Sequence, residues 1–199
     1  MSSNYTRALG VVLALGGGAL LSMAAQDKAV VETIEKQADD VGKKDWAELS
    51  KQGEAVAKKH ELMDIMNLMK LRNAPGKVKG MGVGKEPNKI KPDGIDAKII
   101  NMSRNPMAQA LLNREQPDLI RMAQITAAIA SATVHQCPVD KKMGDKDPAV
   151  WKKGMEDMHK ASLEFIEALK KKDPMTVQKA AFKLRGTCTD CHNIFRDSQ

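Results

Sequence analysis

Aromatic residues and cysteines are scarce in this chain of 199 residues. Aromatic side chains make up 3% of it, whereas methionine occurs 13 times, so we expect a core filled by methionine, alanine and aliphatic side chains. The length fits one domain, or a domain with an appendage, and is sufficient for a sizeable core. Of the three cysteines, Cys137 stands alone beside Pro138.

Sequence patterns that mark several enzyme classes are also missing. No nucleophile–base pair and no pair of carboxylates at a suitable spacing stands out, so we do not expect an enzyme. The Gly- and Lys-rich stretch at 80–85 lacks the spacing and the preceding strand of a phosphate-binding P-loop. A flexible connection is the better interpretation of this stretch.

A long apolar run occurs once, at the N-terminus, and is short for a membrane span of about 20 residues. Arg7 precedes the apolar segment Ala8–Leu21, and small residues follow at 22–25. This pattern predicts a cleaved signal peptide over residues 1–25 and a periplasmic location, with an uncleaved membrane anchor as the alternative. No cysteine follows directly, which argues against a lipoprotein.

The net charge of +7 comes mainly from lysine. In an exported chain this charge does not indicate nucleic-acid binding. Ordinary solubility explains it, and docking to acidic partners or to an anionic membrane surface is the functional alternative.

The strongest motif is Cys188-Thr189-Asp190-Cys191-His192 near the C-terminus, because this spacing is the attachment signature of a c-type haem. On a helix, both sulfurs and the imidazole project from one face. The thiols of Cys188 and Cys191 can then form thioethers with the two vinyl groups of one haem c, and His192 is the expected proximal ligand of its iron. A thioredoxin-like dithiol would need strands nearby, and a zinc site would need a second pair of soft ligands; neither is found.

Residues 26–199 read almost entirely as helix. An amphipathic helix is predicted over residues 26–44, and Asp45 can cap the next one, whose apolar stripe continues to Met63. The segment 74–94 is predicted to be a long Gly/Lys-rich loop. Further helices are predicted to start at Pro106, Pro117, Pro148 and Pro174.

The last two predicted helices are joined by a very short turn at Asp173 and must therefore be antiparallel neighbours. The final helix carries an apolar heptad that includes both cysteines of the motif. Haem would accordingly be held inside a helical bundle. The members of this heptad are Val177, Ala181, Leu184, Cys188, Cys191 and Phe195.

These residues resemble the class II cytochromes c, the family of cytochrome c′ and cytochrome c-556. The resemblance is carried by the C-terminal Cys188-x-x-Cys191-His192, by Phe195-Arg196, and by the preceding hairpin opened by Asp147-Pro148 and Trp151. It is strongest over residues 148–196. The resemblance implies an all-α antiparallel four-helix bundle, often a homodimer, here extended by the N-terminal helix and the 74–94 loop.

Arg196 matches a family arginine that lies near the proximal histidine and tunes it by its charge. The alternative is a cation favoured by the helix dipole at a helix C-terminus.

The identity of the distal ligand separates two functions. Glu61-Leu62-Met63-Asp64 looks like the family's first-helix ligand motif, and the periodicity also places Met63 on the apolar stripe. With a methionine ligand the family members are six-coordinate electron carriers; without one they are five-coordinate and bind NO or CO. Met66 and Met69 are rival ligands or simple core residues, and His60 is a rival ligand or a partly exposed structural histidine.

We therefore expect a periplasmic monohaem cytochrome in electron transfer, with a gas-binding cytochrome c′ as the alternative. Its partners would be redox proteins, which lysines of the 74–94 loop would help to dock if those partners are acidic. Three features depart from the family: the N-terminal helix, the long loop and Cys137. The thiol of Cys137 could form an intermolecular disulfide or remain buried and inert.

Overall fold

The computed structural model of the chain describes residues 18–76 and 78–196, with side chains from residue 28 onward. Residues 1–17 of the predicted signal peptide lie outside this range, and residues 22–25 lie within the first helix. The described residues form seven helices and no strand, which confirms the all-α prediction. The helices are α1 (Gly18–Ala38), α2 (Trp46–Ala57), α3 (Leu62–Asn67), α4 (Ile95–Arg104), α5 (Gln109–Thr133), α6 (Pro148–Lys171) and α7 (Pro174–Phe195).

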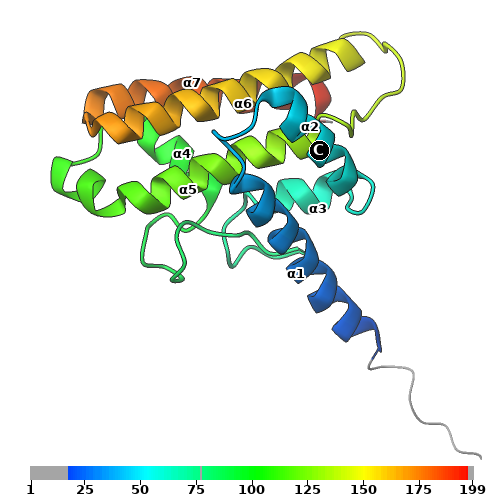
Figure 1. Cartoon of the computed structure of the whole chain (residues 1–199), viewed down its shortest axis with the longest axis horizontal. Coiled ribbons are helices and arrows are strands. Elements are labelled where there is room, and N and C mark those ends of the chain that lie inside the picture. The colour runs from blue at the N-terminus through cyan, green and yellow to red at the C-terminus, as the bar shows by residue number, and fades with distance from the viewer. Residues whose placement is uncertain (1–17, 77, 197–199) are drawn as a thin grey trace, which may run out of the picture.

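The three long helices α5, α6 and α7 run side by side in alternating directions (Figure 1). The Gln116 amide of α5 donates to the carbonyl of Leu169 near the end of α6. At the opposite end of the pair, the Trp151 indole donates to the carbonyl of Thr133 at 2.9 Å. These two contacts fix α5 and α6 as antiparallel.

Three aspartates start helices as predicted. Asp45 caps α2 in a capping box, and Asp147 and Asp173 each accept a backbone N–H at the first turn of α6 and α7. Between α6 and α7, Lys172 adopts a left-handed conformation with φ of 56°. The chain therefore reverses within two residues, and α7 packs back along α6.

The helices α1 and α2 pack against α5, and α1 extends away from the other helices in Figure 1. The buried Gln37 amide of α1 donates to the Leu49 carbonyl of α2 and to the Ser131 hydroxyl of α5. The predicted N-terminal helix is thus present and holds its apolar stripe in the core. The buried members of this stripe are Val30, Ile34, Ala38 and Val41.

The predicted helix starts at Pro106 and Pro117 are both wrong. Pro106 lies before α5, which begins at Gln109. Pro117 does not start a helix but lies inside α5. Its ring removes one N–H donor opposite Asn113, and both residues are exposed, so water can satisfy the free carbonyl. The sequence analysis also missed α4, which follows the 74–94 loop and packs antiparallel on α7, with the Gln178 amide donating to the Arg104 carbonyl.

The 74–94 loop is not the flexible connection that its composition suggests. Val78, Val83 and Ile90 are buried in the main core. Asp93, which is also buried, accepts the N–H groups of Val83 and Asn88, both at 2.9 Å. The loop is therefore held against the helices by apolar contacts, and the hydrogen bonds to Asp93 fix its own conformation.

The core matches the composition, since Met102, Met122, Met155 and Met158 are all buried. Within the described part of the chain, no helix has both the length and the apolar character needed to cross a membrane.

Candidate functional site

The predicted cysteine motif lies on a regular helix. The last helix, α7, runs without interruption from Pro174 to Phe195. Val177, Ala181, Leu184 and Phe195 are buried as the heptad predicts, whereas the two motif cysteines are half-buried. The inward stripe of α7 is thus confirmed, and it leads directly to both thiols.

The two thiols face different surroundings. Burial, together with the nearby negative charge of Asp96 at the start of α4, raises the pKa of Cys188 to about 12. Burial also raises the pKa of Cys191 to about 11, and the neighbouring Cys137 contributes. Both thiols are free and protonated at neutral pH, unlike the low-pKa thiol of a thioredoxin-like dithiol.

His192 is exposed, and its ring takes part in no hydrogen bond or ion pair with any described residue. The next turn ends the helix at Arg196, whose N–H donates to the His192 carbonyl at 3.0 Å. The Arg196 side chain is exposed as well. The imidazole of His192 is therefore available to a ligand, which is the condition that a proximal iron ligand must meet.

An apolar cluster surrounds this end of α7. We call it the terminal cluster: the buried side chains of Trp151, Met155 and Phe195, with half-buried residues packed on them. The rings of Trp151 and Phe195 meet edge to face with centroids 5.1 Å apart. The half-buried members are Trp46, Leu62, Val134, Cys137, Val139, Cys191 and Ile194.

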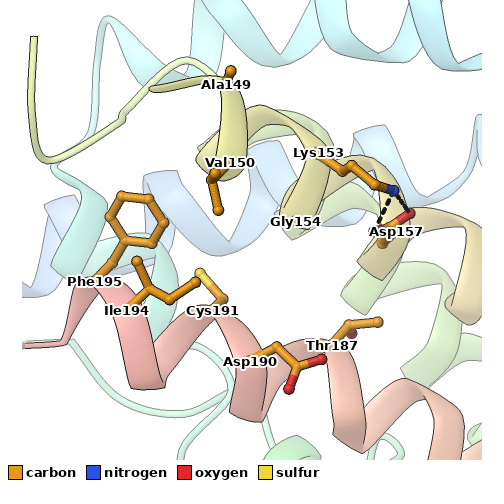
Figure 2. Close-up of a pocket in the computed structure, with 10 residues that line it drawn as sticks. All are labelled: Ala149, Val150, Lys153, Gly154, Asp157, Thr187, Asp190, Cys191, Ile194 and Phe195. Carbon is orange, nitrogen blue, oxygen red and sulfur yellow. Dashed lines mark hydrogen bonds and ion pairs between the residues drawn. The ribbon is translucent and has the colours of Figure 1, made fainter. Parts of the chain in front are cut away.

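A cavity of about 430 Å³ opens between the N-terminal half of α6 and the C-terminal half of α7. Figure 2 shows the Cys191 sulfur directed from α7 toward Val150 of α6, with an ion pair of Lys153 and Asp157 farther along. Cys188 and His192 are not among the residues that line it. Of the three motif residues that would bind haem, the cavity therefore borders only Cys191.

The short helix α3 lies beside the cysteine motif. At its start, Leu62 packs on the terminal cluster together with Cys191. Just beyond its end, the Met69 carbonyl accepts the N–H of Asp96 at 3.0 Å, and the charge of Asp96 acts on Cys188. The start of α3 thus shares a cluster with Cys191, and the segment after its end is bonded to α4.

The predicted stripe through Met63 is wrong. The stripe ends with α2 at Ala57, and a non-helical segment separates α2 from α3. The Met63 side chain is 60% exposed, whereas Met69 is 6% exposed and Met66 is half-buried. Met63 is therefore the methionine of this segment that does not serve as a core residue.

His60 is buried, not partly exposed as the sequence suggested. Burial holds its pKa below the usual value, so its ring is neutral near pH 7. Its Nδ1 atom has no hydrogen-bond partner in the structure. His60 thus remains a rival to Met63 on chemical grounds.

No group of three or more metal-ligating side chains converges among the described residues. Cys137, Cys188, Cys191 and His192 in particular do not surround one point, as four zinc ligands would have to.

Comparisons of the chain with protein-family models, with curated proteins and with solved structures find no match.

Sequence reasoning missed two residues near the motif, Asp96 and Leu62. Asp96 belongs to the unpredicted helix α4. Apart from its position within the motif Glu61-Leu62-Met63-Asp64, nothing in the sequence around Leu62 indicates that it packs near the cysteine motif.

Proposed function

We propose that this protein is an exported monohaem cytochrome of the class II type that carries single electrons. One observation carries the proposal. The Cys188-x-x-Cys191-His192 motif lies on a continuous helix, with two free thiols on its inward stripe and an imidazole that no described residue engages.

The donor set suits haem c. In each attachment the S–H of a cysteine adds across a vinyl double bond, so that one C–S bond and one C–H bond form. Cys188 and Cys191 are three residues apart on α7 and thus one helical turn from each other. His192 then offers a ring nitrogen to the iron, and the bound haem supplies a reversible one-electron couple.

The surroundings of α7 support a position for the haem on the side of α3. His192 does not line the α6–α7 cavity, and Met63, whose side chain is exposed, follows Leu62, which packs on the terminal cluster. We assign Met63 as the distal ligand. A buried methionine would have to leave the core to bind the iron, at a cost in stability, whereas the exposed Met63 would not.

We assign the four-helix bundle to α4, α5, α6 and α7, because contacts link them in the sequence α5–α6–α7–α4. Met63 on α3 then lies outside these four helices, not on the first of them. Arg196, one turn beyond His192, is assigned the role of tuning it electrostatically. Exposed lysines of the 74–94 loop, including Lys79, Lys85 and Lys91, provide a positive surface for an acidic redox partner. Export follows from the proposed signal at 1–25.

Cysteine variants test the proposal. The full-length protein is produced with a signal for export in cells with a working cytochrome maturation system, and covalent haem is measured after denaturation. Cys188→Ala or Cys191→Ala should lower the yield of covalently bound haem strongly, because each removes one thioether. Cys137→Ala, which removes a half-buried thiol outside the motif, is the matched control and should retain haem. Equal loss in all three variants would contradict the proposal.

A gas-binding cytochrome is the second candidate, in which the exposed Met63 does not bind the iron. A side chain that is 60% exposed can leave the sixth position of the iron open. Rapid stoichiometric uptake of CO by the ferrous protein would support this candidate. A low-spin ferric spectrum with slow or absent CO uptake supports the electron carrier.

A further inference from the structure

Cys137 and Cys191 lie against the same apolar cluster. Cys137 follows α5 in the segment that leads to α6, and Cys191 lies on α7, yet both pack on the buried side chains of the terminal cluster. Two free thiols from distant parts of the sequence are thus brought together.

The thiol of Cys191 is accessible to a small oxidant. Its sulfur borders the cavity between α6 and α7, which opens to solvent (Figure 2). Cys137 is half-buried and lies outside any helix, between α5 and the exposed Pro138. A disulfide between the two sulfurs therefore requires a shift of this connection and not of a helix.

The two motif cysteines cannot pair with each other as readily. Side chains three residues apart on a helix have Cβ atoms about 5–6 Å apart. A disulfide requires about 3.5–4.5 Å. Since α7 is helical through both positions, a bond between Cys188 and Cys191 would have to distort the helix.

We infer that Cys137 and Cys191 form an intrachain disulfide in the haem-free protein, and that this bond competes with haem attachment. In the reaction both thiols lose a proton and together give two electrons to a disulfide oxidant. One S–S bond forms in this chain, and the oxidant's disulfide becomes two thiols. The first half of the inference, disulfide formation, concerns the haem-free chain alone. The second half, competition with haem attachment, rests on the proposed function.

Peptide mapping tests the first half. The full-length protein is produced without cytochrome maturation, equilibrated with oxidised and reduced glutathione, alkylated and digested with trypsin without reduction. Trypsin cuts after Arg121, Lys141, Arg185 and Arg196, so the expected product joins residues 122–141 to residues 186–196. Cys188→Ser should retain this product, and both Cys137→Ser and Cys191→Ser should lose it. A bond between Cys188 and Cys191, glutathione adducts without the cross-link, or three free thiols would each overturn the inference.

Haem loading tests the second half. With cytochrome maturation and an oxidising medium, Cys137→Ser should raise the fraction of chains that carry covalent haem, and added reductant should abolish the difference. Equal loading of wild type and Cys137→Ser would refute the competition. The two proposals fail separately: a cross-link without haem under any condition removes the proposed function, and haem without a cross-link removes this inference.

Discussion

Individual side chains in the segment 60–69 differ sharply in what they can do. Met69 fills the core, His60 is buried with an unpartnered ring nitrogen, and Met63 is exposed. A large apolar side chain that stays exposed does not contribute the stabilising free energy that its burial would give. At Met63 this exposure is understandable if the thioether meets a bound group rather than the core.

Replacing Met63 tests the assignment of its sulfur as the distal ligand of the haem iron. In the haem-loaded protein, Met63→Ala should remove the methionine–iron charge-transfer band from the ferric spectrum and convert the iron to high spin. The matched control is Met143→Ala in the α5–α6 connection, because Met143 is 59% exposed against 60% for Met63. An unchanged spectrum in Met63→Ala would exclude Met63 as the ligand.

Gly53 shows how a missing side chain can determine packing. A Cβ atom at this position would lie 1.9 Å from the Ser131 carbonyl oxygen, which belongs to the backbone of α5. Gly53→Ala should therefore destabilise the protein by about 3 kcal/mol or more. Gly154→Ala on α6 is the control, since nothing lies within 4 Å of its Cβ, and it should stabilise by about 0.5–1 kcal/mol. Urea unfolding of the purified full-length proteins measures both; a small effect of Gly53→Ala would show that α2 and α5 can separate there.

At the scale of the elements, the conformation of the 74–94 loop depends on the carboxylate of Asp93. Burial by itself would raise the pKa of Asp93, but the N–H groups of Asn88 and Val83, with the Arg72 guanidinium at 3.0 Å, hold it below its ordinary value of 3.8. A carboxylate with a lowered pKa stabilises the folded state at neutral pH, and this contribution is lost as the pH falls through the folded-state pKa.

Asp93→Asn tests this dependence. At neutral pH the variant should be less stable than wild type by roughly 2 kcal/mol, because an amide nitrogen would replace one charged acceptor. At a pH well below 3.8 the wild-type side chain is protonated too, so the two free energies of unfolding should converge. A difference that does not depend on pH would mean that the charge of Asp93 is unimportant for the loop.

A lysine on the buried face of α4 explains why this helix was not predicted from the sequence. Its buried face comprises Ile95, Lys98, Ile99 and Met102, which would be a regular apolar pattern without the lysine. Lys98 is buried because it pairs with Glu115 of α5 at 2.8 Å. A cation at a core position hides the periodicity, and its partner lies too far along the chain to be recognised.

For the molecule as a whole, the reliable sequence signals were local. Caps at Asp45, Asp147 and Asp173 and the heptad of α7 depend on residues a few positions apart, and the structure confirms them. The break between α2 and α3 falls in Lys58–Glu61, which contains neither proline nor glycine, and the packing of Leu62 on the terminal cluster is a tertiary contact. Such features depend on partners that periodicity cannot identify.

The cysteine motif and the terminal cluster lie at one end of the packed helices. There α3, the start of α6 and the end of α7 contribute to the terminal cluster, and Cys191 of the motif packs on it. The remaining helices fix the direction of α7 and cover its inward face. The proposed electron transfer depends on a single helix end being able to hold one porphyrin.

Mass analysis of one peptide tests that claim most directly. Trypsin releases residues 186–196, which contain Cys188, Cys191 and His192, from protein made with a working cytochrome maturation system. We predict that this peptide carries the added mass of one haem and resists alkylation at both cysteines. Recovery of the peptide with both cysteines alkylated and no added macrocycle would contradict the account.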